Sequence, residues 1–93
     1  MRYSFDPIKQ ASNLKKHGLD LADAKAVLES GQTVTFEDRR FSYGEERFVT
    51  LGPLAGVLVV VVTAETSEHI RVISMRKADR HEQKIYRQHL GGV

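Results

Sequence analysis

The sequence predicts an α+β fold in which an N-terminal helical hairpin, an antiparallel β-sheet of about three to four strands and a C-terminal helix follow one another. Apolar residues recur at helical spacing near both ends of the chain, before Gly31 and after Asp79. Between them, short runs rich in β-branched residues are separated by brief turns, which favours antiparallel pairing. The 93 residues suffice for one modest core, so we expect a single domain over residues 1–93.

Local end signals define the two helices of the hairpin. Asp6 suits the N-cap and Pro7 the N1 position of the first helix, and Gly18 suits its C-terminal end. Apolar residues at helical spacing within it are Ile8, Ala11 and Leu14. The second helix is predicted to begin at Asp20 and to end at Ser30–Gly31.

The middle of the chain changes to strand periodicity. A strand is predicted from Val57 to Glu65, and its unbroken apolar run indicates burial on both faces, hence a central position. A polar loop containing Tyr43 is predicted from Glu37 to Glu45, and Asp79-x-x-Glu82 is a capping box for the last helix, which Gly91–Gly92 ends. The other predicted strands are a short one at Tyr3–Phe5, then Thr33–Phe36, Arg47–Gly52 and Ile70–Lys77.

The strand Ile70–Lys77 carries cations among its apolar residues. Strict alternation places Ile70, Val72, Ser74 and Arg76 on one face and Arg71, Ile73, Met75 and Lys77 on the other. Buried charge is unfavourable unless it is paired. Two interpretations stay open: the arginines lie at strand ends and reach solvent or meet surface carboxylates, or the strand presents Ser74 and Arg76 to an anionic ligand.

Composition excludes several classes of protein. There is no cysteine, so disulfide frameworks and thiol chemistry are absent. The apolar run from Val57 to Ala64 is too short to cross a membrane and the start of the chain lacks the pattern of a signal peptide, so we expect a cytoplasmic protein. Residues 1–18 and 66–93 each carry a net charge of +3, whereas residues 19–65 carry −4. If the two basic ends meet in space, they would form one surface suited to a polyanion.

The polar residues predict no metal site. The four histidines show no pair at ligand spacing, and P-loop, Rossmann and nucleophile-elbow motifs are absent. What remains suits metal-free RNA cleavage, in which the 2′-hydroxyl of the substrate is the nucleophile and the protein transfers protons and stabilises charge on phosphorus. The same residue types also fit the surface of any basic protein. The candidates are His17, Glu46, Arg47, Arg71, Ser74, Arg76 and Tyr86.

Several candidates also have a purely structural interpretation. His17 and Lys16 lie in the last turn of the first helix, where cations complement the helix dipole. Glu46 and Arg47 could form a surface ion pair of low net value. Tyr86 falls on the apolar side of the last helix, where core packing with a satisfied hydroxyl is the expected role.

An ordered set of short motifs resembles the BrnT toxin family. The set covers nearly the whole chain: KHG after an Asn-bearing helix, ER opening a strand and RxISxRxA before the last helix. Two positions depart from the usual family pattern, with Phe5 in place of tryptophan and Met75 in place of alanine. The matching residues are Phe5–Pro7, Lys9, Asn13, Lys16–Gly18, Glu46–Arg47, Gly52, Val59–Thr63, Arg71–Ala78, Glu82 and Tyr86.

The resemblance implies the toxin half of a type II toxin–antitoxin module, with a fold similar to RelE-type ribonucleases. The expected activity is that of a metal-independent endoribonuclease that needs no cofactor, cleaves RNA and inhibits translation and growth. The expected partner is a BrnA-like antitoxin whose ribbon-helix-helix part binds DNA, assembled with the toxin as dimers of each. The alternative is a non-enzymatic basic module that docks an acidic protein or nucleic acid.

The resemblance also implies roles for individual residues. His17 is the expected proton-transfer residue, Arg47 and Arg76 are expected to hold the scissile phosphate, and Glu46 is an alternative base or orienting group. Arg71 begins on the face opposite Arg76, where a carboxylate such as Glu46 holds it unless a bulge turns it back to the site. The expected substrate-binding residues are Lys16, Arg71, Ser74 and Tyr86.

Overall fold

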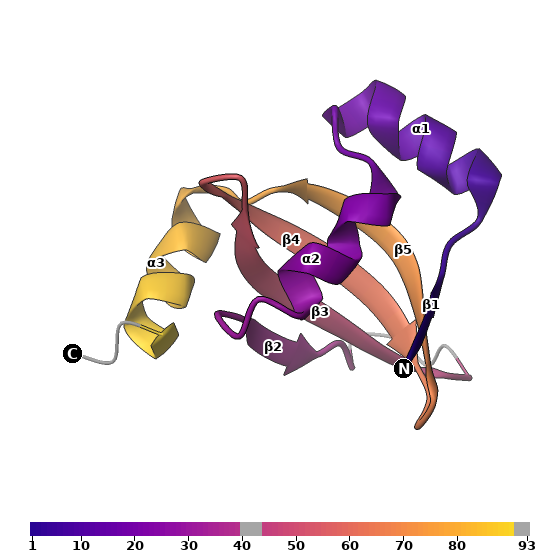
Figure 1. Cartoon of the computed structure of the whole chain (residues 1–93). Helices are drawn as coiled ribbons and strands as arrows, with labels where there is room; N and C mark the ends of the chain where they lie inside the picture. Colours follow the sequence, from indigo (N-terminus) through magenta and orange to yellow (C-terminus); the bar gives the residue numbers. More distant parts are fainter. Residues whose placement is uncertain (40–43, 91–93) are drawn as a thin grey trace.

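The computed structural model describes residues 1–39 and 44–90, the last of these by its backbone alone. The predictions for Tyr43 and Gly91–Gly92 lie outside this part. Along the chain, the elements are β1 (Arg2–Ser4), α1 (Pro7–His17), a 3-10 turn (Leu21–Asp23), α2 (Ala24–Leu28), β2 (Val34–Glu37), β3 (Glu46–Leu54), β4 (Val57–Glu65), β5 (His69–Lys77) and α3 (Arg80–Leu90) (Figure 1).

The strands form one mixed sheet in the order β1-β5-β4-β3-β2. The α+β class and the central position of β4 are confirmed. The predicted sheet of about three to four strands is too small, because five strands pair in the described residues and the fifth is β1, close to the short strand predicted at Tyr3–Phe5. β1 pairs in parallel with the first residues of β5, whereas β2 to β5 pair antiparallel. The parallel pair joins segments more than sixty residues apart, and no local signal specifies such a contact.

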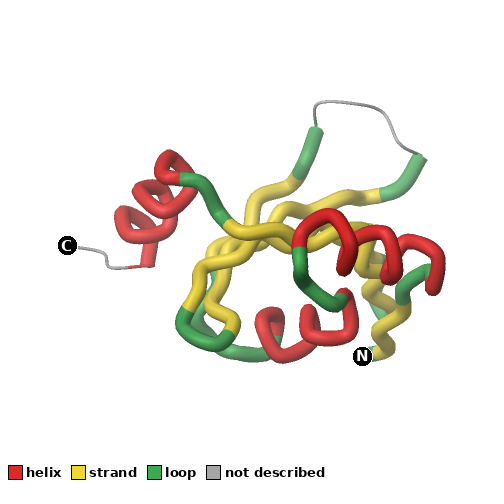
Figure 2. The backbone as a smooth tube through the Cα atoms, turned by 90° about the horizontal axis from the view of Figure 1, so that it is seen from above, coloured by secondary structure: helices red, strands yellow, loops and turns green. Residues whose placement is uncertain are grey.

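The core lies between one face of the sheet and the segment that contains the 3-10 turn and α2. Figures 1 and 2 show α2 crossing one side of the sheet, whereas α3 lies elsewhere, beside β2 and β3. The ring of His89 in α3 contacts that of Phe36 in β2 edge-on, with 5.4 Å between the ring centres. Gly52 of β3 permits this close approach, since a Cβ there would lie 2.8 Å from Cγ1 of Val27. The buried cluster consists of Leu21, Ala24, Val27, Val59, Val61, Val72 and Met75.

Helix α1 is capped as predicted but faces the sheet with a polar residue. The Asp6 carboxylate accepts a hydrogen bond from the amide of Ile8 (2.8 Å), and Gly18 ends the helix with φ of 70°. The side chain of Asn13 is buried and bonds both backbone groups of Met75, which β1 leaves unpaired because it reaches only as far as Arg71. The Asn13 amide therefore completes the open edge of β5.

Strand β5 contains a bulge that the alternating pattern does not predict. Ser74 lies opposite Val62 of β4, and Val72 lies opposite the next residue of β4, so Ile73 is the extra residue. The bulge changes which face the following side chains occupy. Val72 and Met75 consequently both enter the core, and Arg71 lies on the same face as Ser74 and Arg76. The assignment of Arg71 to the opposite face is thus wrong, and the bulge alternative is confirmed.

Candidate functional site

The face of the sheet turned away from α2 gathers most of the predicted cationic residues. Cross-strand neighbours share a face, so the strand register defines it directly. We call this surface the arginine face and define it by Arg47, Arg71, Ser74 and Arg76. These four residues belong to three rows of cross-strand neighbours that run across the sheet. The rows are Arg71–Ala64–Arg47, Ser74–Val62–Val49–Phe36 and Arg76–Val60–Leu51–Val34.

In the first row, one carboxylate joins two arginines. Arg71 and Arg47 are separated by two strand spacings, about 9.5 Å, with the small Ala64 between them. Glu45, just before β3, accepts hydrogen bonds from Nη2 of Arg71 (2.8 and 3.0 Å) and longer ones from Nε and Nη2 of Arg47 (3.4 Å each). Arg71 holds the pKa of the Glu45 carboxyl below its ordinary value, mainly through its hydrogen bond. Both guanidinium groups therefore converge on one anion.

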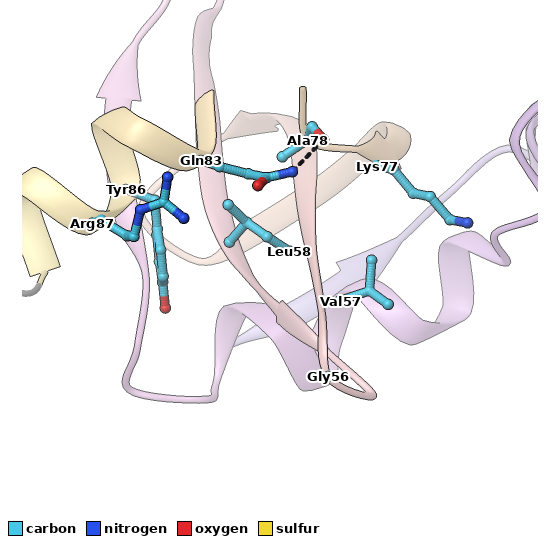
Figure 3. A pocket seen from close by; sticks show the side chains of 8 residues that line it. All are labelled: Gly56, Val57, Leu58, Lys77, Ala78, Gln83, Tyr86 and Arg87. Carbon is cyan, nitrogen blue, oxygen red and sulfur yellow. Dashed lines mark hydrogen bonds between the residues drawn. The ribbon is translucent and has the colours of Figure 1, made fainter. Parts of the chain in front are cut away.

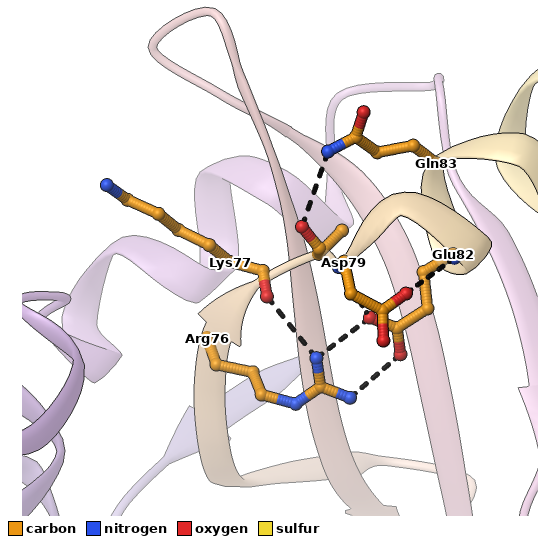
Figure 4. Close-up of polar contacts among 6 residues, drawn as sticks. Arg76, Lys77, Asp79, Glu82 and Gln83 are labelled. Carbon is orange, nitrogen blue, oxygen red and sulfur yellow. Dashed lines mark hydrogen bonds and ion pairs between the residues drawn. The ribbon is translucent and has the colours of Figure 1, made fainter.

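At the other end of β5, Arg76 is fixed by the start of α3 (Figure 4). Its Nη1 and Nη2 donate to the two oxygens of Glu82 at 2.8 and 2.7 Å. Glu82 also accepts from the amide of Asp79 (2.9 Å), while the Asp79 carboxylate accepts from the amide of Glu82 (2.8 Å). The predicted capping box thus also orients a guanidinium. The hydrogen bonds with Arg76 are the main cause that lowers the pKa of Glu82.

The C-terminal end of α1 meets the arginine face at Ser74. Lys16, His17 and Ser74 line a shallow cavity of about 170 Å³, which we call the α1 cavity. Asn13 and Ile73 also border it, so the bulge and the edge contact shape its wall. Ser74 consequently lies both in the middle row of the arginine face and beside His17.

Glu46 and Tyr86 lie away from this group. Glu46 stands opposite Glu65, one residue out of phase with Arg47 and therefore on the other face of the sheet. The hydroxyl of Tyr86 donates to the backbone oxygen of Gln32 at 2.7 Å, which ties α3 to the segment before β2. The Tyr86 side chain lines a separate cavity of about 420 Å³ between α3 and the β3–β4 turn (Figure 3).

Sequence reasoning missed Glu45 and the second role of Glu82. The signal for Glu45 was present, since period-2 alternation puts it on the same face as Arg47 two residues later. The link between Glu82 and Arg76 depends on the angle at which α3 leaves the sheet, for which the sequence offers no pattern. Within residues 1–39 and 44–90, no group of three or more His, Asp or Glu side chains comes together as a metal site. The helices of this part are also too short and too polar to span a membrane.

A protein-family model matches most of the chain. Residues 5–82 match a family model described as "Ribonuclease toxin, BrnT, of type II toxin-antitoxin system". No curated protein matches the chain. The matched segment includes α1, all of β5 and Glu82, and therefore every residue of the arginine face and of the α1 cavity.

Proposed function

The chain belongs to the BrnT family of ribonuclease toxins from type II toxin–antitoxin systems, and from this premise we propose that the arginine face and the adjoining α1 cavity cleave RNA without a metal ion. The observation that carries the proposal is the bulge at Ile73. It puts Arg71 on the same face as Arg76, with Ser74 between them and His17 beside Ser74. A phosphodiester lying across this face would have Arg71 on one side and Arg76 on the other.

In the proposed reaction, the 2′-hydroxyl oxygen attacks the adjacent phosphorus and the bond from phosphorus to the 5′-oxygen breaks. The products are a 2′,3′-cyclic phosphate and a 5′-hydroxyl. A base removes the proton of the 2′-hydroxyl, and an acid supplies one to the leaving oxygen. His17 serves in proton transfer, because imidazole can act as an acid or a base near neutral pH. The pentacovalent phosphorus carries extra negative charge, which Arg47, Arg71 and Arg76 stabilise.

The carboxylates in this proposal orient the arginines. Glu45 holds Arg71 and Arg47 toward one point, and the scissile phosphate replaces it there as their anionic partner. Glu82 keeps Arg76 in one rotamer before substrate binds, which lowers the entropy lost on binding. In this proposal, Glu45 has the orienting role that was expected of Glu46.

The remaining predicted residues are assigned to substrate binding. Lys16 lies in the same cavity as His17 and binds a neighbouring phosphate, and Ser74 donates a hydrogen bond to the sugar or phosphate in the middle of the face. Tyr86 offers only its ring to a nucleotide, since its hydroxyl already bonds Gln32.

Membership of a type II toxin–antitoxin family implies a protein antitoxin as partner. We propose that it is a BrnA-like protein with a ribbon-helix-helix part that binds DNA, and that two copies of each assemble in the cytoplasm. The antitoxin would inhibit by covering the arginine face.

Single substitutions test the proposal. Arg71→Ala, Arg76→Ala and His17→Ala should each lower the rate of cleavage of a labelled RNA by about 10²–10⁴-fold and relieve growth arrest, because each removes a group that acts on the transition state. Arg2→Ala removes an exposed arginine of β1 and should leave both activities unchanged.

Folding and antitoxin binding of each variant are measured in parallel. If the variants raise KM but keep kcat, the substituted residues bind RNA and take no part in its cleavage. That result would contradict the catalytic assignment. Equal losses in Arg2→Ala would show that net charge alone matters.

A further inference from the structure

Helix α1 turns its apolar residues outward. Ile8 is 79% exposed and Leu14 is 50% exposed, and Ala11 between them is exposed as well. Their spacing of three residues keeps them along one side of the helix, which we call the outer stripe. A surface helix normally directs such a stripe toward the core. Here Asn13 occupies the inner side instead, because its amide is needed at the edge of β5.

The outer stripe is a feature of α1 as a whole. Single exposed apolar side chains are ordinary on a protein surface. Two of the five large apolar side chains that are exposed in the described part of the chain, however, lie on this one eleven-residue helix. Apolar residues grouped in this way mark surfaces that another molecule covers.

The charges around the stripe identify the kind of molecule. Helix α1 contains Lys9, Lys15 and Lys16 and no acidic residue between Pro7 and His17. A second copy of the chain would bring like charges together on this face. RNA would contact the lysines but would gain little from aliphatic side chains. An amphipathic helix with apolar residues flanked by carboxylates matches both features.

We propose that the outer stripe is the docking site for an acidic amphipathic helix of the antitoxin, an inference that rests on the toxin–antitoxin assignment. The lining of the α1 cavity includes Lys16 and His17 of the same helix, but Ile8, Ala11 and Leu14 take no part in it. The outer stripe therefore anchors the antitoxin on a side of α1 that the substrate does not need.

The test uses the full chain and its cognate antitoxin, produced separately and mixed. Ile8→Ser with Leu14→Ser removes the stripe, and Val57→Ser is the matched control, since Val57 is 42% exposed on the β3–β4 hairpin. Burial of one such side chain is worth roughly tenfold in affinity. We expect the double variant to bind about 100-fold more weakly by calorimetry, with melting temperature and RNA cleavage unchanged. Lys15→Glu should weaken binding further and reduce its dependence on salt.

Three outcomes would overturn the proposal. Wild-type affinity in the double variant would exclude the stripe as an antitoxin contact. A free toxin that changes from dimer to monomer on substitution, with antitoxin affinity unchanged, would assign the stripe to self-association. Loss of RNA cleavage with unchanged antitoxin affinity would assign it to substrate. If the wild-type chain itself fails to cleave RNA, the proposed catalytic function fails, while the comparison of affinities still decides the role of the stripe.

Discussion

Replacing Asn13 by alanine should destabilise the protein more than any change at the helix surface. Asn13 is 6% exposed and takes part in three hydrogen bonds: Nδ2 donates to the oxygens of Leu19 and Met75 at 2.9 Å each, and the amide of Met75 donates to Oδ1 at 3.1 Å. Each buried hydrogen bond contributes about 1 kcal/mol, and a buried group left without a partner costs at least that much. The expected loss is therefore about 3 kcal/mol, out of roughly 5–14 kcal/mol for a chain of this length.

Urea unfolding followed by circular dichroism measures this loss. With a slope of about 1–1.5 kcal/mol per molar urea, the midpoint should fall by roughly 2–3 M while the slope stays the same. Ser12→Ala changes an exposed neighbour and should alter the free energy of unfolding by less than about 0.5 kcal/mol. A loss below about 1 kcal/mol in Asn13→Ala would refute the reasoning, since α1 would then be held to β5 by other contacts.

Asn13→Asp separates the donor from the acceptor at the same position. The aspartate can still accept from the amide of Met75, but its second oxygen faces two carbonyl oxygens and is buried. At neutral pH we expect at least as large a loss as in Asn13→Ala. The difference from the wild type should shrink as the pH falls and the carboxyl is protonated, because it then regains a donor.

Two further predictions concern packing and pH. Gly52→Ala should lower the free energy of unfolding by about 1–2 kcal/mol, because its Cβ would lie 2.8 Å from Val27 and 3.0 Å from Thr33, and thermal unfolding checks this. Arg76 lowers the pKa of Glu82 in the folded protein, so the stabilisation is complete above the ordinary glutamate pKa of about 4.3 and is lost as the pH falls through the lower folded-state value. The stability of Glu82→Gln should therefore depend less on pH below about 5, and an unchanged pH profile would contradict the role of this pair.

Features that depend on neighbouring residues could be predicted from the sequence. The caps at Asp6, Gly18 and Asp79 involve contacts within a few residues, and composition alone indicated the central position of β4. The pairing of β1 with β5 could not be predicted, because a three-residue strand carries little pattern and its partner is distant.

The residue types of the candidate site could be predicted from the sequence, but their arrangement could be predicted only in part. The alternating pattern placed Ser74 and Arg76 together, which the register confirms. One extra residue at Ile73 moved Arg71 to their face, and nothing in the sequence distinguishes a bulged strand from a regular one at this position. The outward direction of Ile8 and Leu14 was equally hidden, because it follows from the hydrogen bonds of Asn13 with a distant strand.

The most direct test of the central claim is the chemistry of the cleaved ends. Purified toxin is incubated with a labelled RNA in the presence of EDTA, and the products are identified by mass spectrometry. Attack by the 2′-hydroxyl across the arginine face predicts 2′,3′-cyclic phosphate and 5′-hydroxyl ends, with no cleavage where the 2′-hydroxyl is replaced by hydrogen. Products with 3′-hydroxyl and 5′-phosphate ends, or cleavage that EDTA abolishes and Mg²⁺ restores, would contradict the account.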